Sequence, residues 1–323
     1  MYFFIPLMPC LLSIPFGFVF FFSSAQAKQL DFSKKATKNT TTFHYQWTAP
    51  QKETQQIQVV FSQIDLQEEL NFVVNVPMKE YLEYQKHALK QWASTIDDIE
   101  LDVTISRDDS IELSIGSYDE DVMRQRAKEA QIIQAQSAQE YLKKQGYIEI
   151  NNEVMPDYSS LVSEYSKKLY PLSDALFIEG DNFQSYAIRT LHFVQNIPYE
   201  ASQKISYRRP IRLLWDNKGD CDSKTVLYLA LLKSKFPDVQ LAVVNIPEHT
   251  FAFIQQVGLQ TEMELQVDGQ NWVPVEPVGP NLATFGNIRK DSLQYLQSGS
   301  FQFYTIKYTN FSQYSCSRYH FNL

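Results

Sequence analysis

The chain has 323 residues, of which 44% are hydrophobic and 20% are charged, and its formal net charge is −8 at pH 7. This length and composition are typical of a globular protein with more than one structural unit. The negative charge gives no electrostatic footprint for nucleic acid, so we expect no nucleic acid among the partners of this protein.

The first 27 residues predict a secretory signal peptide. Residues 2–22 are almost entirely apolar, and Ala25 and Ala27 then form an Ala-x-Ala cleavage site before Lys28. We therefore expect the mature protein to be exported and to be periplasmic or extracellular. The apolar run approaches the length that spans a bilayer, so the alternative is an uncleaved N-terminal segment that anchors the protein in a membrane.

Residues 28–170 are predicted to form an N-terminal α+β region. Two strands are expected at 99–105 and 111–115, where alternating apolar residues flank a polar turn. Helices are expected at about 78–93 and 119–144, the second because its Ala and Gln content favours a helix over a strand. We recognise no family for this region, and its sequence fits a scaffold as well as it fits a surface that recognises a substrate or partner.

Residues 171–323 are predicted to form a second unit, organised around a helix that begins at Cys221. Gly219 supplies a turn, Asp220 is a good N-cap, and the apolar run at 225–232 is typical of a buried helix. A thiol in the first turn of a helix faces backbone N–H groups and the positive end of the helix dipole. We therefore expect a lowered pKa for Cys221, which would make it a reactive nucleophile.

A histidine and a carboxylate follow on predicted strands. His249 lies between two strand-like segments, and Glu276 ends the strand that follows the turn at Asp268 and Gly269. This placement would let the acid hold one imidazole nitrogen while the other nitrogen faces the thiol, as in catalytic triads. Asp268 is the rival for the orienting role, although a turn residue is the simpler interpretation of it.

In order and spacing, these residues resemble the transglutaminase-like superfamily. Members carry Gly-x-Cys at the start of a core helix, then a His that leads a strand, then an acid in a Trp-x-x-x-acid-Pro element. The corresponding residues here are Cys221, His249, and Trp272 with Glu276, and Glu276 stands where Asp is commoner. The resemblance covers about a third of the chain and implies a papain-like core, with the cysteine helix packed on an antiparallel sheet. Asp220 stands where the eukaryotic crosslinking enzymes carry Gln, so bacterial members, often peptidases or amidases, are the better match.

The resemblance implies thiol acyl chemistry on a protein or peptide substrate. Cys221 would attack a peptide or isopeptide carbonyl to give a thioester, and nearby backbone N–H groups, with the side chain of Trp215 or Asn217, would stabilise the oxyanion. We expect water to release the thioester, because the cell envelope is water-rich and no amine-binding motif is visible. The alternatives are an amine-accepting transglutaminase and a non-catalytic binding or assembly module of the envelope with an inert Cys221.

We expect no cofactor and no metal. The sequence contains no Gly-rich phosphate loop and no cysteine pairs at zinc-ligand spacing. Of the three cysteines, Cys10 would leave with the signal peptide. We expect Cys221 and Cys316 to be unpaired, because a disulfide between them would silence the nucleophile.

Overall fold

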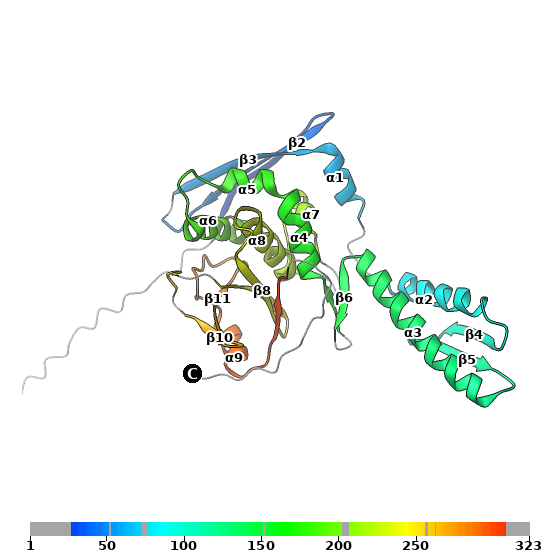
Figure 1. Ribbon diagram of the computed structural model, residues 1–323. Helices are drawn as coiled ribbons and strands as arrows, with labels where there is room; N and C mark the ends of the chain where they lie inside the picture. Colours follow the sequence, from blue (N-terminus) through cyan, green and yellow to red (C-terminus); the bar gives the residue numbers. More distant parts are fainter. Residues whose placement is uncertain are drawn as a thin grey trace, which may run out of the picture.

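The computed structural model describes residues 27–307 apart from 52, 73–76, 151–152, 202–206, 256–257 and 262. The protein is α+β, as expected, and its helices accompany antiparallel sheets (Figure 1). The predicted signal peptide up to residue 26, with Cys10, and Cys316 near the other end of the chain lie outside the described residues. Within the described ranges, no helix combines the length and the apolar character needed to cross a membrane.

The strands, in chain order, are β1 (Gln29–Ala36), β2 (Thr40–Thr48), β3 (Thr54–Ser62), β4 (Glu100–Ile105), β5 (Ile111–Gly116), β6 (Tyr147–Ile150), β7 (Glu153–Pro156), β8 (Gln240–Ile246), β9 (His249–Gln255), β10 (Leu265–Val267), β11 (Gln270–Val275) and β12 (Gln302–Thr305). The helices are α1 (Gln63–Leu70), α2 (Met78–Ala93), α3 (Glu120–Lys144), α4 (Tyr158–Lys168), α5 (Tyr170–Leu176), α6 (Phe183–Asn196), α7 (Pro210–Asp216), α8 (Cys221–Lys235) and α9 (Lys290–Gln297).

A five-stranded sheet in the order β10-β11-β9-β8-β12 forms the C-terminal part of the fold. Its neighbouring strands are antiparallel, which suits the short turns that join β8 to β9 and β10 to β11. Helix α8 packs on β9 and also contacts α4, α5, α6 and α7. The buried residues of α8 run without a break from Ser223 to Lys233, so this helix lies at the centre of the core.

A three-stranded sheet in the order β1-β2-β3 lies over α5 and α6 (Figure 1). Burial alternates along β2, whose inner face carries Phe43, Tyr45 and Trp47. The hydroxyl group of Tyr45 donates to the backbone oxygen of Leu214 (3.0 Å), and its ring packs edge to face on Phe193. The N-terminal sheet therefore shares one hydrophobic core with the helices around α8.

The expected boundary between two units near residue 170 falls between α4 and α5. Both helices contribute buried residues to the core that includes the N-terminal sheet and α8, among them Leu161 on α4 and Leu172 on α5. Helix α4 also contacts α8 directly.

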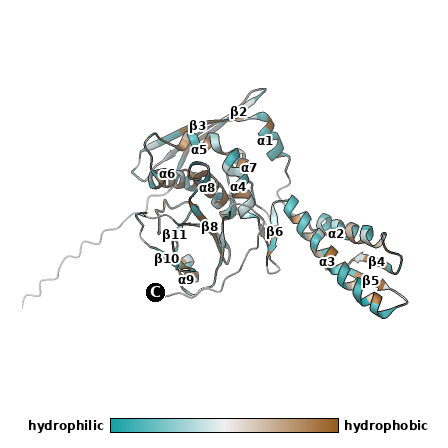
Figure 2. Cartoon of the chain, viewed as in Figure 1, coloured by the Kyte–Doolittle hydropathy of each residue, from teal (hydrophilic) through white to brown (hydrophobic). Residues whose placement is uncertain are grey.

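Residues 78–144 form a lobe that projects from the rest of the molecule (Figure 1). It consists of α2, the hairpin β4–β5 and α3, and it has a small hydrophobic cluster of its own around Leu89, Val103 and Ala130. The predicted hairpin and the two predicted helices of this region are confirmed, with bounds within one residue of those expected. Figure 2 shows α3 as mainly hydrophilic with hydrophobic residues at intervals, which is typical of a helix packed on one side only.

Candidate active site

Cys221 is the first residue of α8, and the residues before it explain why the helix begins there. The side chain of Asp220 accepts a hydrogen bond from the backbone N–H of Ser223 (2.8 Å) and so caps the helix. Glycine at position 219 lets the backbone pass close to Leu213, since a Cβ there would lie 2.6 Å from Cδ1 of Leu213. The predicted start of the cysteine helix is confirmed.

His249 is the first residue of β9 and pairs with Ile246 at the end of β8. Two residues form the turn between them, in which Glu248 has a φ of 62°. The Nε2–H group of His249 donates to Oε2 of Glu276, the residue directly after β11, at 2.6 Å. The side chains of His249 and Glu276 are only 10% and 5% exposed, so water competes little for this contact.

This hydrogen bond selects one tautomer of the imidazole. Because a carboxylate accepts hydrogen bonds, the ring proton lies on Nε2, and Nδ1 is left as the nitrogen of His249 that can take a proton. The other carboxylate oxygen of Glu276 accepts from the backbone N–H of Val278 (3.1 Å), which restrains the carboxylate plane. The imidazole is therefore oriented as a general base requires.

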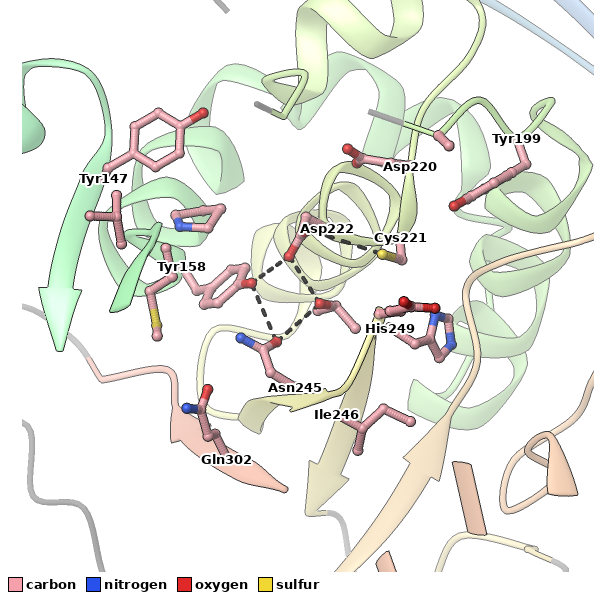
Figure 3. Close-up of a pocket in the computed structure, with 16 residues that line it drawn as sticks. Tyr147, Tyr158, Tyr199, Asp220, Cys221, Asp222, Asn245, Ile246, His249 and Gln302 are labelled. Carbon is pink, nitrogen blue, oxygen red and sulfur yellow. Dashed lines mark hydrogen bonds between the residues drawn. The ribbon is translucent and has the colours of Figure 1, made fainter. Parts of the chain in front are cut away.

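Cys221 and His249 both line a cavity of about 600 Å³ (Figure 3). Its walls come mainly from the start of α8, the turn between β8 and β9, the hairpin β6–β7 and the start of α4. The structure thus brings the thiol and the imidazole of the predicted triad to one cavity. Glu276 does not line that cavity and holds the imidazole from outside its wall.

The acid–base state of the thiol differs from the expectation. Burial, followed by the negative charges of Asp222 and Asp220, raises the pKa of Cys221 to about 12. The expected lowering of this pKa is wrong, because the backbone amides of Thr250 and Asp222 offset burial and the two carboxylates only in part. Such a thiol is protonated at neutral pH and needs a base to remove its proton during attack.

Asp222 is a site residue that the sequence analysis missed. Its Oδ2 atom lies 4.0 Å from Sγ of Cys221, and its Oδ1 atom accepts from the hydroxyl groups of Tyr158 and, at 3.0 Å, Thr250 (Figure 3). Asn245 also bonds to both hydroxyl groups, at 3.3 and 3.0 Å, and so ties α4 to the sheet at this point. Burial raises the pKa of Asp222. Its position directly after Cys221 was the available signal, but an acid in a first helical turn is ordinarily a dipole-stabilising charge.

The two residues expected to support the oxyanion, Trp215 and Asn217, do not line the cavity. The side-chain amide of Asn217 exchanges two hydrogen bonds with that of Gln29 on β1, at 2.6 and 3.0 Å. The ring of Trp215 lies under the ammonium group of Lys34, 4.0 Å from the ring centroid. Both side chains therefore join α7 and the chain after it to the N-terminal sheet.

Asp268 occupies the turn between β10 and β11, where its φ is 50° and Gly269 follows. Glu276 lies beyond the opposite end of β11, so the two acids flank a six-residue strand that is about 20 Å long. Of the two rivals for the orienting role, the one that bonds to His249 is Glu276.

The sequence analysis missed two residues of the helical core that act on the acid, Gln195 by a hydrogen bond to its backbone oxygen and Lys224 by its charge. Lys224 is fully buried on α8, and its ammonium group donates to the backbone oxygen of Ile197 (2.6 Å). Burial lowers the pKa of Lys224 to about 7, although the charge of Glu276 acts in the opposite direction. The sequence signal for the buried contact between Lys224 and Ile197 was a lysine inside an otherwise apolar helix.

Among the residues that the structure describes, no group of three or more His, Cys, Asp or Glu side chains could hold a metal ion. Comparison of the chain with protein-family models, curated proteins and solved structures found no match. Membership of the transglutaminase-like superfamily therefore stays a prediction that rests on the sequence motif.

Proposed function

We propose that this protein is an exported, cysteine-dependent acyl-transfer enzyme with a papain-like core of the transglutaminase-like type. The observation that carries the proposal is the hydrogen bond between His249 and Glu276, which presents an oriented imidazole at the cavity that Cys221 also lines. A histidine with a purely structural role would not need a buried carboxylate bonded to its Nε2 atom.

In the proposed reaction, Sγ of Cys221 bonds to the carbonyl carbon of a peptide or isopeptide amide while Nδ1 of His249 takes the thiol proton. Backbone N–H groups at the start of α8 stabilise the oxyanion. The C–N bond then breaks, His249 gives its proton to the leaving amine, and a thioester remains on Cys221. Water attacks the thioester with its proton passing to His249, which releases the carboxylic acid and restores the thiol.

The raised pKa of Cys221 favours one of two forms of this mechanism. A thiolate–imidazolium pair at rest needs a thiol pKa below that of the imidazole, and burial with two neighbouring carboxylates opposes this. Proton removal during attack, with Glu276 stabilising the imidazolium as it forms, agrees better with the site.

The same raised pKa also favours a second candidate, a non-catalytic binding or assembly module of the cell envelope with an inert thiol. An activated ester separates the two candidates without knowledge of the natural substrate. We expect p-nitrophenyl acetate to place one acetyl group on Cys221, as peptide mass spectrometry would show, and Cys221→Ala to abolish this label. We expect His249→Asn to slow acetylation by a factor on the order of 10² or more, since it removes the general base.

Equal acetylation rates in the native protein and in His249→Asn would contradict the enzymatic proposal and support the binding module. Release of the acetyl group then distinguishes the two acyl acceptors. We expect acetate as the product, and its replacement by the acetyl amide when ethanolamine is added would show an amine-accepting transferase instead.

A further inference from the structure

The wall of the Cys221 cavity has a one-sided charge. Three acidic residues, Asp220, Asp222 and Glu248, line it, and the described residues of the wall include no Lys or Arg. The other lining residues include tyrosines, among them Tyr158, neutral amides, and apolar residues such as Met155 and Ile246. The cavity is large enough for a ligand and contains the thiol and the imidazole. The charge of its wall then selects which ligands can bind there.

The Asp222 carboxyl group contacts the thiol. Its Oδ2 atom lies 4.0 Å from Sγ of Cys221, and its Oδ1 atom is held by the hydroxyl groups of Tyr158 and Thr250. These two donors orient the carboxylate but bring no positive charge to it. A group that reaches the thiol through this cavity must therefore pass or contact the carboxyl group of Asp222 within a few ångströms of the reacting atom.

We propose, on the basis of the acyl-transfer function above, that the acyl donor carries an ammonium or guanidinium group beside its reacting amide and that Asp222 is the counter-ion of this cation. The tyrosine rings of the wall suit the same ligand, because cations bind favourably over aromatic faces. A donor with a carboxylate in this position is excluded by repulsion from the three acids.

The bound cation would also act on the nucleophile. The charges of Asp222 and Asp220 are among the causes that raise the pKa of Cys221, so a cation that neutralises them eases loss of the thiol proton. Asp222 would thus be a specificity-determining residue that couples the charge of the substrate to the reactivity of the thiol.

Small thiol reagents of opposite charge test this proposal on the full chain without a natural substrate. The reagents are 2-aminoethyl methanethiosulfonate, a cation, and 2-sulfonatoethyl methanethiosulfonate, an anion. The rate at Cys221 is measured by peptide mass spectrometry, and each rate is divided by the rate of the same reagent with 2-mercaptoethanol. The ratio of the two normalised rates reports the charge preference of the cavity, because the degree of thiol ionisation cancels from it.

We expect the native ratio to favour the cation by about tenfold or more, and Asp222→Asn to bring the ratio close to one. Glu248→Gln, in the turn before His249, should reduce the ratio in part, and this second variant tests the proposal even if Asp222→Asn does not fold. Glu112→Gln, at an exposed position of β5 in the lobe, is the matched control and should leave the ratio unchanged.

A native ratio near one, or a ratio that both cavity variants leave unchanged, would overturn the proposal. This outcome is independent of the acetylation experiment, since the reagents need only a thiol and no general base. If Cys221 shows the charge preference but p-nitrophenyl acetate does not acetylate it, the acyl-transfer function fails while the cation selectivity of the cavity stands.

Discussion

The side-chain amide of Gln195 donates to the backbone oxygen of Glu276 at 2.8 Å and, through the same nitrogen, to that of Ala283 at 3.1 Å. Gln195 lies on α6, so the loop that carries the acid is attached to the helical core as well as to the sheet. The position of the Glu276 carboxylate therefore depends on the packing of α6, and its hydrogen bond to His249 depends on contacts distant from the cavity. Such support is what a preorganised base requires.

We first predict that Glu276→Gln lowers the acetylation rate of Cys221 by a factor on the order of 10² while the fold is kept. The amide can still bond to His249, but it stabilises an imidazolium poorly and permits the wrong tautomer. Asp268→Asn is the control and should leave the rate unchanged, because Asn tolerates the positive φ of that turn. If Asp268→Asn slowed the reaction and Glu276→Gln did not, the orienting role would belong to Asp268.

The second prediction concerns the loop after Glu276. A Cβ at Gly279 would press into the backbone oxygen of Gln195, which cannot move without displacing α6. We expect Gly279→Ala to lower the free energy of unfolding by about 1–3 kcal/mol and to slow acetylation, since the loop moves away from His249. Gly116→Ala is the control, because its Cβ would meet no atom closer than 3.8 Å. Urea unfolding of both variants checks the prediction, and an unchanged midpoint for Gly279→Ala would contradict it.

The third prediction is a dependence of stability on pH that comes from Lys224. Burial lowers its pKa from 10.5 to about 7. Between these two values the unfolded chain holds a proton on Lys224 that the folded protein has released, so the free energy of unfolding rises with pH in this window, by up to about 1.4 kcal/mol per pH unit. We expect Lys224→Met to remove this rise.

The measurement for Lys224 is urea unfolding at pH 7, 8 and 9, with the slope of native protein compared with that of the variant. Lys128→Met, at an exposed position of α3, serves as the control and should keep the native slope. A Lys224→Met protein with the native slope would show that the buried amine does not titrate in this range.

The fourth prediction concerns the thiol. With its pKa raised to about 12, Cys221 should react with iodoacetamide at a rate that is still rising at pH 10, whereas an ordinary thiol approaches its plateau there. Asp222→Asn should shift this profile to lower pH, because it removes the nearest negative charge. A plateau below pH 8 in the native protein would show instead a thiolate paired with protonated His249.

Short sequence patterns were enough to predict the parts of the site that depend on neighbouring residues. The cap at Asp220 and the apolar run after it predicted a helix that begins at Cys221, and the turn at Asp268 predicted the hairpin that places Glu276 at a strand end. These features depend on residues a few positions apart. The expected hydrogen bond between His249 and Glu276, whose partners are 27 residues apart, is present in the structure.

The parts that could not be predicted depend on distant residues. Asn217 was expected near the oxyanion, but its side chain bonds to Gln29, 188 positions earlier, because the N-terminal sheet joins the same core. The pKa of Cys221 was expected to fall on the evidence of its helix position, and burial by the rest of the fold raises it instead. Burial is a property of the whole tertiary structure, which one sequence without related sequences does not reveal.

The projecting lobe has a mechanical consequence for the cavity. Helix α3 has 25 residues and is therefore about 37 Å long, and it ends at Lys144, three positions before Tyr147 in the cavity wall. The chain passes from α3 to β6 through Gln145 and Gly146, and the two elements are also in contact, so the lobe is coupled directly to the wall. We therefore expect a displacement at the far tip of the lobe to reach the cavity wall at Tyr147, whereas Cys221 and His249 lie on α8 and β9 in the core of the fold.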